Sequence, residues 1–209
     1  ATGKALVDNL LRPSGVQIPE DEEDWEPNGD FNDWRFDLGP AAATPDGKSF
    51  VLLYRNSLRV FDVSTGREVR NLGGQDGRVL TLDVSPDGGL ALTNGWGKPT
   101  TIPLAGGGRR SVSPDRHIAR VLELNTDQKR LELALPGQQA GAVAFNANGS
   151  LFAVAGASPP KVEVFDTQSG QLRWSLDALP AGVTAMVFSH DHRLLATALQ
   201  DTTIIVWDL

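Results

Sequence analysis

Residues 142–176 read AVAFNANGSLFAVAGASPPKVEVFDTQSGQLRWSL, and this stretch decides the fold. Asn148-Gly149 and Ser169-Gly170 are residue pairs typical of tight turns. Short apolar or alternating runs bounded by such turn residues indicate β-strands joined by hairpins. Four runs of this kind follow one another, at 142–145, 151–155, 162–165 and 172–176. We therefore predict a meander of four short antiparallel strands.

The first turn of this stretch recurs along the chain. Pro presets a φ near −65°, Asp or Asn hydrogen-bonds within its own turn, and Gly accepts a positive φ. The last residues of the four copies are 41, 61 and 43 residues apart. The copies are Thr44-Pro45-Asp46-Gly47, Ser85-Pro86-Asp87-Gly88, Asn146-Ala147-Asn148-Gly149 and the degenerate Ser189-His190-Asp191-His192.

A second marker is an apolar run that ends in an aromatic residue or Leu followed by an acid. Its four acids are 61, 43 and 42 residues apart. Both markers share a period near 42 residues, with one interval about 20 residues too long, so one insertion lies inside the second repeat. The copies are Val60-Phe61-Asp62-Val63, Val121-Leu122-Glu123-Leu124, Val164-Phe165-Asp166-Thr167 and Val206-Trp207-Asp208-Leu209.

Four-stranded units with this period and this ending resemble the WD-repeat β-propeller family. Only Trp207-Asp208 is a literal Trp-Asp pair, and no Gly-His dipeptide, the usual start of the family's repeat, occurs. The chain is therefore similar to a divergent member. The resemblance implies an all-β propeller of four-stranded antiparallel blades, with four WD-like repeats in this chain. It also implies an incomplete buried polar network, and the plain Ser-Pro-Asp-Gly turns favour a bacterial source.

The repeats divide a single propeller unit, residues 1–209, into consecutive parts. The chain stops at the end of a third strand and opens with residues 1–6, which match the fourth-strand opening at residues 64–69. We expect this N-terminal strand to complete the last blade or to pair in trans. Three ways of closing the ring stay open. Other chain segments or a partner complete it, four blades close it alone, or two copies exchange residues 1–10. The predicted parts are 1–10 as outer strand of the last blade, 11–37 as an acidic aromatic insertion, 38–77 as a blade, 78–138 as a blade with an insertion at 96–116, 139–179 as a blade, and 180–209 as three strands of the last blade.

The composition excludes several classes of function. The net charge is −7, and residues 1–37 alone carry ten acids against three bases, so the remainder is neutral. An acidic chain lacks the net positive charge that displaces counterions from phosphate, and we expect no nucleic-acid partner. No run of about 18 apolar residues occurs, which predicts no membrane span. The absence of Cys excludes disulfides and thiolate metal sites.

The insertion at 11–37 combines aromatic rings with carboxylates. Trp25, Phe31 and Trp34 are candidate anchors for a partner that the carboxylates attract. Two other interpretations stay open. The rings cover the propeller's own surface, or residues 24–30 begin a calcium-binding loop of the EF-hand type, although Arg35 stands where the closing Glu belongs.

The second insertion contains Trp96 and the run Gly106-Gly107-Gly108-Arg109-Arg110. We expect this run to form an exposed loop tip. Two alternatives stay open: Arg109 or Arg110 pairs with the acidic insertion, or these arginines bind an external anion. The connections that carry the two insertions leave the same face of a propeller, and loops on a rigid scaffold are where binding residues concentrate.

The predicted function is that of a non-catalytic WD-repeat propeller scaffold that binds a protein or peptide partner through one loop-rich face. The alternative is a structural segment of a larger or oligomeric propeller assembly, completed by another copy or by segments of a parent chain. No catalytic residue, metal ligand or cofactor is assigned, because Ser111 and Ser113 lack a nucleophile elbow and His190 and His192 lack a third metal ligand. The candidate partner contacts are Trp25, Phe31, Trp34, Trp96, Arg109 and Arg110.

Overall fold

The computed structural model describes residues 38–54, 57–75, 77–97, 100–103, 109–112, 116–126, 128–136, 140–177 and 179–209. All regular elements in this part of the chain are β-strands. Within it, no helix is long and apolar enough to cross a membrane.

The strands form four antiparallel blades and one separate hairpin. The first blade contains β1 (Leu38–Ala43), β2 (Ser49–Tyr54), β3 (Ser57–Asp62) and β4 (Glu68–Gly74). The second contains β5 (Val79–Val84), β6 (Leu90–Trp96), β9 (Arg116–Glu123) and β10 (Lys129–Pro136). The third contains β11 (Ala140–Phe145), β12 (Leu151–Ala157), β13 (Pro160–Asp166) and β14 (Leu172–Leu176). The fourth contains β15 (Val183–Phe188), β16 (Leu194–Leu199) and β17 (Ile204–Asp208).

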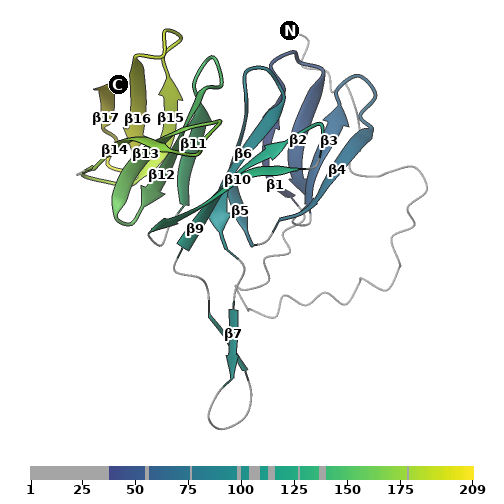
Figure 1. The fold of residues 1–209 in the computed structure, drawn as a ribbon, viewed down its shortest axis with the longest axis horizontal. Helices are drawn as coiled ribbons and strands as arrows, with labels where there is room; N and C mark the ends of the chain where they lie inside the picture. The colour runs from purple at the N-terminus through teal and green to yellow at the C-terminus, as the bar shows by residue number, and fades with distance from the viewer. Residues whose placement is uncertain are drawn as a thin grey trace.

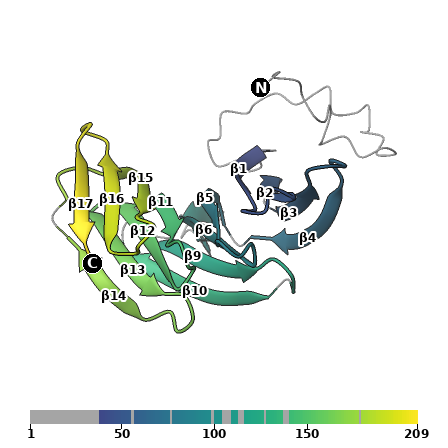
Figure 2. The ribbon, with the colours of Figure 1, turned by 90° about the horizontal axis from the view of Figure 1, so that it is seen from above.

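The blades stand side by side in chain order. Their first strands contact one another in sequence, β1 with β5, β5 with β11, and β11 with β15. Figure 1 shows the four sheets as a row, and Figure 2 shows from above that the row curves into an open arc, with β1 and β17 at its two ends. This arrangement confirms the predicted all-β, propeller-like fold of antiparallel blades.

The first three blades have the four strands that the sequence predicts, whereas the described part of the fourth blade has three. The strand predicted at residues 1–10, which would complete that blade in cis or in trans, lies outside the described residues. The acidic insertion predicted at 11–37 lies outside them as well.

The repeated turns have the predicted chemistry. Gly47, Gly88 and Gly149 take φ values of 68°, 71° and 72°, which L side chains rarely adopt. In the degenerate fourth copy, His192 takes a φ of 67° at the same position. Each turn also closes a backbone hydrogen bond, such as the one that Gly47 N donates to Thr44 O over 2.9 Å. The sequence motif thus sets the start of every second strand.

The core lies between blades. One cluster of buried apolar side chains joins the first and second blades, another joins the second and third, and another joins the third and fourth. Phe152 of β12 is among the largest fully buried side chains, and its ring stacks on Phe165 with 5.3 Å between centroids. Both rings belong to the cluster that includes Leu92 of the second blade.

Polar contacts also link and fix the blades. Asp83 of β5 accepts a hydrogen bond from Phe145 N of the next blade over 2.8 Å, and burial raises the pKa of its carboxyl group. Within the fourth blade, Trp207 Nε1 donates to the Thr197 hydroxyl over 3.1 Å. Thr197 is fully buried, so this bond fixes the indole ring against β16.

Replacing Phe152 by Ala is predicted to lower the free energy of unfolding by about 3–5 kcal/mol, because it opens a cavity between the second and third blades. Urea denaturation measures the change. Trp174→Ala is the control, since that ring is 37% exposed and its loss leaves a smaller void. Equal losses in the two variants would contradict a core placed between the blades.

Candidate functional site

The insertion between β6 and β9 forms a separate hairpin. Its strands are β7 (Thr100–Pro103) and β8 (Arg109–Val112), with Thr100 opposite Val112 and Pro103 opposite Arg109. Among the described strands, β7 and β8 pair only with each other. Figure 1 shows the hairpin well outside the four sheets, at the bottom of the view.

Trp96 lies at the base of this hairpin. It is the last residue of β6, where its backbone N donates to Arg78 O over 2.7 Å. Its ring meets His117 of β9 edge-on, with 5.4 Å between ring centroids. His117 is buried, whereas Trp96 is half-buried and has one part available to solvent. A half-buried indole held in this way suits a contact surface that is apolar and carries one N–H donor.

Two glycines allow the chain to pass closely beneath Trp96. A Cβ atom at Gly95 would lie 1.9 Å from Arg78 O, and one at Gly77 would lie 2.0 Å from Trp96 O. Both backbone contacts therefore exclude any larger residue. Gly77, with a φ of 98°, stands where the Gly-His dipeptide of the resembled family is expected.

Of the six predicted contact residues, the structure describes Trp96 completely and Arg109 and Arg110 as strand residues only. Arg109 and Arg110 belong to β8, so the expectation that the glycine–arginine run forms a loop tip is wrong for these two residues. The prediction failed because a strand of four residues, two of them Arg, shows no alternation of apolar and polar side chains. The side chains of Arg109 and Arg110 lie outside the described part, as do Trp25, Phe31 and Trp34 entirely.

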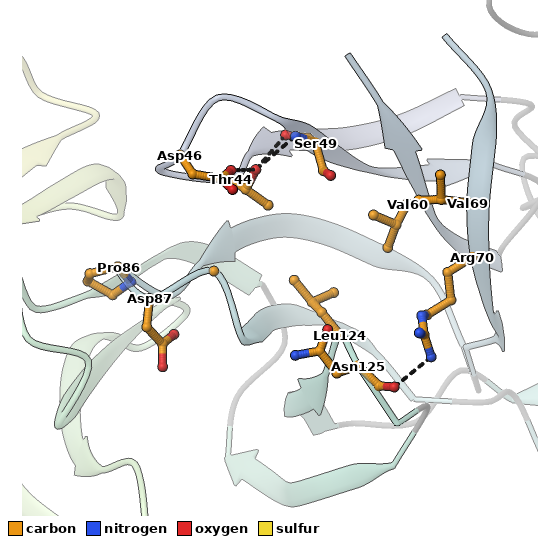
Figure 3. Close-up of a pocket in the computed structure, with 11 residues that line it drawn as sticks. Thr44, Asp46, Ser49, Val60, Val69, Arg70, Pro86, Asp87, Leu124 and Asn125 are labelled. Atoms are coloured by element: carbon orange, nitrogen blue, oxygen red, sulfur yellow. Dashed lines mark hydrogen bonds between the residues drawn. The ribbon is translucent and has the colours of Figure 1, made fainter. Parts of the chain in front are cut away.

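A groove of 350 Å³ lies between the first and second blades, at the opposite end of the strands from the hairpin. This placement follows from β6, which starts beside the turn that contains Asp87 and ends at Trp96. Figure 3 shows the groove between two repeated turns and the outer strand β4. Its lining residues are Thr44, Asp46, Ser49, Val60, Val69, Arg70, Pro86, Asp87, Gly88, Leu124 and Asn125.

The carboxylates of the groove are committed to their own turns. Asp46 accepts hydrogen bonds from the Thr44 hydroxyl over 2.7 Å and from Lys48 N over 3.0 Å, and the Thr44 bond is the main cause of its lowered pKa. Asp87 likewise accepts from the Ser85 hydroxyl over 2.6 Å, and this bond lowers its pKa. Neither carboxylate is therefore poised near neutral pH for proton transfer.

The cation of the groove is engaged as well. Arg70 Nη1 donates to the backbone oxygen of Asn125 over 2.6 Å and so ties β4 to the second blade (Figure 3). Sequence reasoning missed the groove because it forms between two repeats, whereas each motif describes one repeat. The signal was the pair of Pro-Asp-Gly turns, whose tips form one wall.

The structure adds little in favour of catalysis. Within the described ranges, no group of three or more His, Cys, Asp or Glu side chains is placed to hold a metal ion. His190 is exposed and His192 is half-buried, both in the turn that precedes β16.

Comparison with known proteins identifies one repeat and the fold. The family model described as WD domain, G-beta repeat matches residues 170–208. One repeat of the chain therefore matches the WD-repeat family, and the fold is β-propeller-like. Among curated proteins, no relative matches the sequence.

Two solved structures share the fold of this chain. The computationally designed Ika4 protein is 19% identical, with a TM-score of 0.62, over 82% of this chain and 91% of that chain. Hydrazine synthase from Kuenenia stuttgartiensis is 16% identical, with a TM-score of 0.64, over 82% of this chain and 46% of that chain. At these identities the likeness concerns the fold alone.

The turn carboxylates predict how stability depends on pH. In Asp166, hydrogen bonds from Ser169 N, the Arg173 guanidinium and the Ser169 hydroxyl lower the pKa well below its ordinary value. A folded pKa below the unfolded value of about 3.9 means that the unfolded chain binds the proton more tightly. The contribution to stability is then full above about pH 4 and is lost as the pH falls through the folded pKa.

We therefore expect the turn carboxylates to leave the urea midpoint unchanged between about pH 7 and pH 5 and to lower it below about pH 4. Asp166→Asn removes one of these carboxylates and is predicted to make the acid branch shallower. The unsubstituted chain in the same buffers is the control. An acid branch of unchanged slope in the variant would contradict the role of this turn.

Proposed function

We propose that this protein is a non-catalytic scaffold that binds a protein or peptide partner on the face that carries the β7–β8 hairpin. WD repeats generally mediate protein–protein interaction, which supports the class of function. The single observation that carries the choice of face is the hairpin itself, because it is ordered as paired strands and projects beyond the blades.

The second blade does not need the hairpin for its own pairing. β6 and β9 are adjacent antiparallel strands, and Trp96 is the direct partner of His117. A two-residue turn is the shortest common link between such strands. Ordering a longer connection costs conformational entropy, about 1–2 kcal/mol per residue for the backbone. An insertion that the blade does not require, on a rigid scaffold, supports a role in recognition.

The proposed contacts are Trp96 at the base of the hairpin and Arg109 and Arg110 on β8, together with Trp25, Phe31 and Trp34 of the acidic insertion. Aromatic rings and arginines are the residue types that dominate the binding energy of protein interfaces. The net charge of −7 opposes a nucleic-acid partner, so the proposal is restricted to proteins and peptides.

Removal of the hairpin tests the proposal. Residues 98–115 are replaced by Asn-Gly, which closes β6 and β9 with a type I′ turn beyond the pair of Trp96 and His117. We expect a melting temperature within a few degrees of the parent and the loss of every partner that depends on this face. Immobilised parent and variant chains are compared by quantitative affinity capture from the same extract.

Leu172→Asp is the matched control, because Leu172 is 49% exposed on β14, an outer strand of another blade. The control should capture the same proteins in the same amounts as the parent. Capture that is identical with and without the hairpin, in a variant that folds, contradicts the proposed face.

A further inference from the structure

Each blade has a forward face, turned toward the next blade along the chain, and a rear face, turned toward the preceding one. The middle strands supply equivalent pairs to the forward faces, and in the first three blades every member of these pairs is at most 8% exposed. All members are apolar except Asn94. The pairs are Val51–Val60 and Leu53–Leu58, Leu92–Val121 and Asn94–Ala119, and Ala153–Val164 and Ala155–Val162.

The fourth blade repeats the pattern without a neighbour. Its equivalent pairs are Ala196–Val206 and Ala198–Ile204. Val206 is 58% exposed and Ile204 is 70% exposed, whereas Val164 and Val162 at the same positions of the third blade are completely buried. The residues at these positions are apolar in both blades. Their exposed fractions differ because no described blade packs on the forward face of the fourth blade.

The rest of this forward face is apolar except for Asp208, which lies opposite Leu194. Val187 of β15 is 63% exposed, and Leu194 of β16 is 39% exposed. Asp208, at the end of β17, is the one charged residue in the three strands of the blade. Four of the seven large hydrophobic side chains that are exposed in the described residues therefore lie in this one blade. A contiguous apolar patch of this kind marks an interaction surface.

The rear face of the first blade has the complementary character. Phe50 and Phe61 stack there with 5.1 Å between ring centroids. The equivalent rear-face pair of the third blade, Phe152 and Phe165, belongs to the cluster that contains the forward-face residue Leu92. No described blade precedes the first one, and Phe50 is only partly buried.

The chain's own first blade is not placed to cover its fourth. The first strands of the blades contact in the order β1, β5, β11, β15, and Figure 2 shows the first and fourth blades at opposite ends of the arc. A forward face can, however, receive a rear face from another molecule by the contact that already joins neighbouring blades within the chain.

We propose that the forward face of the fourth blade packs on the rear face of the first blade of a second copy, and that the reverse contact closes a ring of two chains. Such head-to-tail contacts form a closed ring when the rotation per chain closes. Two chains of four blades give eight, which is within the range of known propellers. This inference concerns a surface other than the proposed partner-binding face and does not depend on it.

Light scattering coupled to size exclusion tests the assembly on the full chain. We expect a mass of about 45 kDa, twice the 22.4 kDa of one chain. Val206→Asp and Ile204→Asp place a charge in the interface and should each halve the mass. Val69→Asp is the matched control, because Val69 is also a 58% exposed Val but lies on β4, and it should leave the mass unchanged. Circular dichroism confirms that each variant is folded.

A chain that is monomeric at every concentration up to about 100 µM overturns the proposal, as does a dimer whose mass neither Asp substitution changes. Cross-linking then tests the orientation of the two chains. The chain has no Cys of its own, so an introduced Cys is the only thiol that reacts. Copies with Val206→Cys are mixed with copies with Phe50→Cys and treated with a short bismaleimide. A mixed product is expected, and products formed only between two Val206→Cys copies overturn the head-to-tail arrangement.

Discussion

The constraint on which this structure depends is that each blade is apolar on both faces. Successive side chains of a strand point to opposite faces, so the continuous apolar run Leu151 to Ala155 in β12 needs cover on each side. Neighbouring blades supply that cover through the three interblade clusters. At about 25 cal/mol per Å² of buried apolar area, this packing is the main stabilising term. Among the described residues, the first and the fourth blade each have a neighbouring blade on one face only.

The same constraint separates stability from recognition. Strand positions that face a neighbouring blade are fixed by packing, whereas the connections at the blade ends are free to vary. The pair of Trp96 and His117 closes the second blade before the insertion begins, so the hairpin of β7 and β8 adds surface without disturbing the core. At the opposite end, the turn carboxylates of Asp46 and Asp87 stabilise the start of the next strand, and the groove between them is a by-product of two repeats lying side by side.

The fold could be predicted from the sequence because the repeat carries its own turn chemistry. Gly149 and Asp166 mark the ends of strands, and the strands predicted at 142–176 differ from the observed ones by at most two residues at each end. The β7–β8 hairpin was not predicted, since Arg109 and Arg110 gave no strand pattern. The exposed face of the fourth blade was not predicted either. Val206 and Ile204 look like buried strand residues in the sequence, and only the arrangement of the blades shows that nothing in the described chain covers them.

A double-mutant cycle across one blade boundary tests the central claim most directly. Val164 of β13 and Leu195 of β16 are fully buried in the cluster between the third and fourth blades. If packing between blades stabilises the fold, Val164→Ala and Leu195→Ala should be coupled by about 0.5–3 kcal/mol in urea denaturation. Leu58, in the cluster between the first and second blades, provides the comparison. The losses in the free energy of unfolding caused by Leu58→Ala and Val164→Ala should add within about 0.3–0.5 kcal/mol. Strict additivity of Val164→Ala and Leu195→Ala would contradict the account.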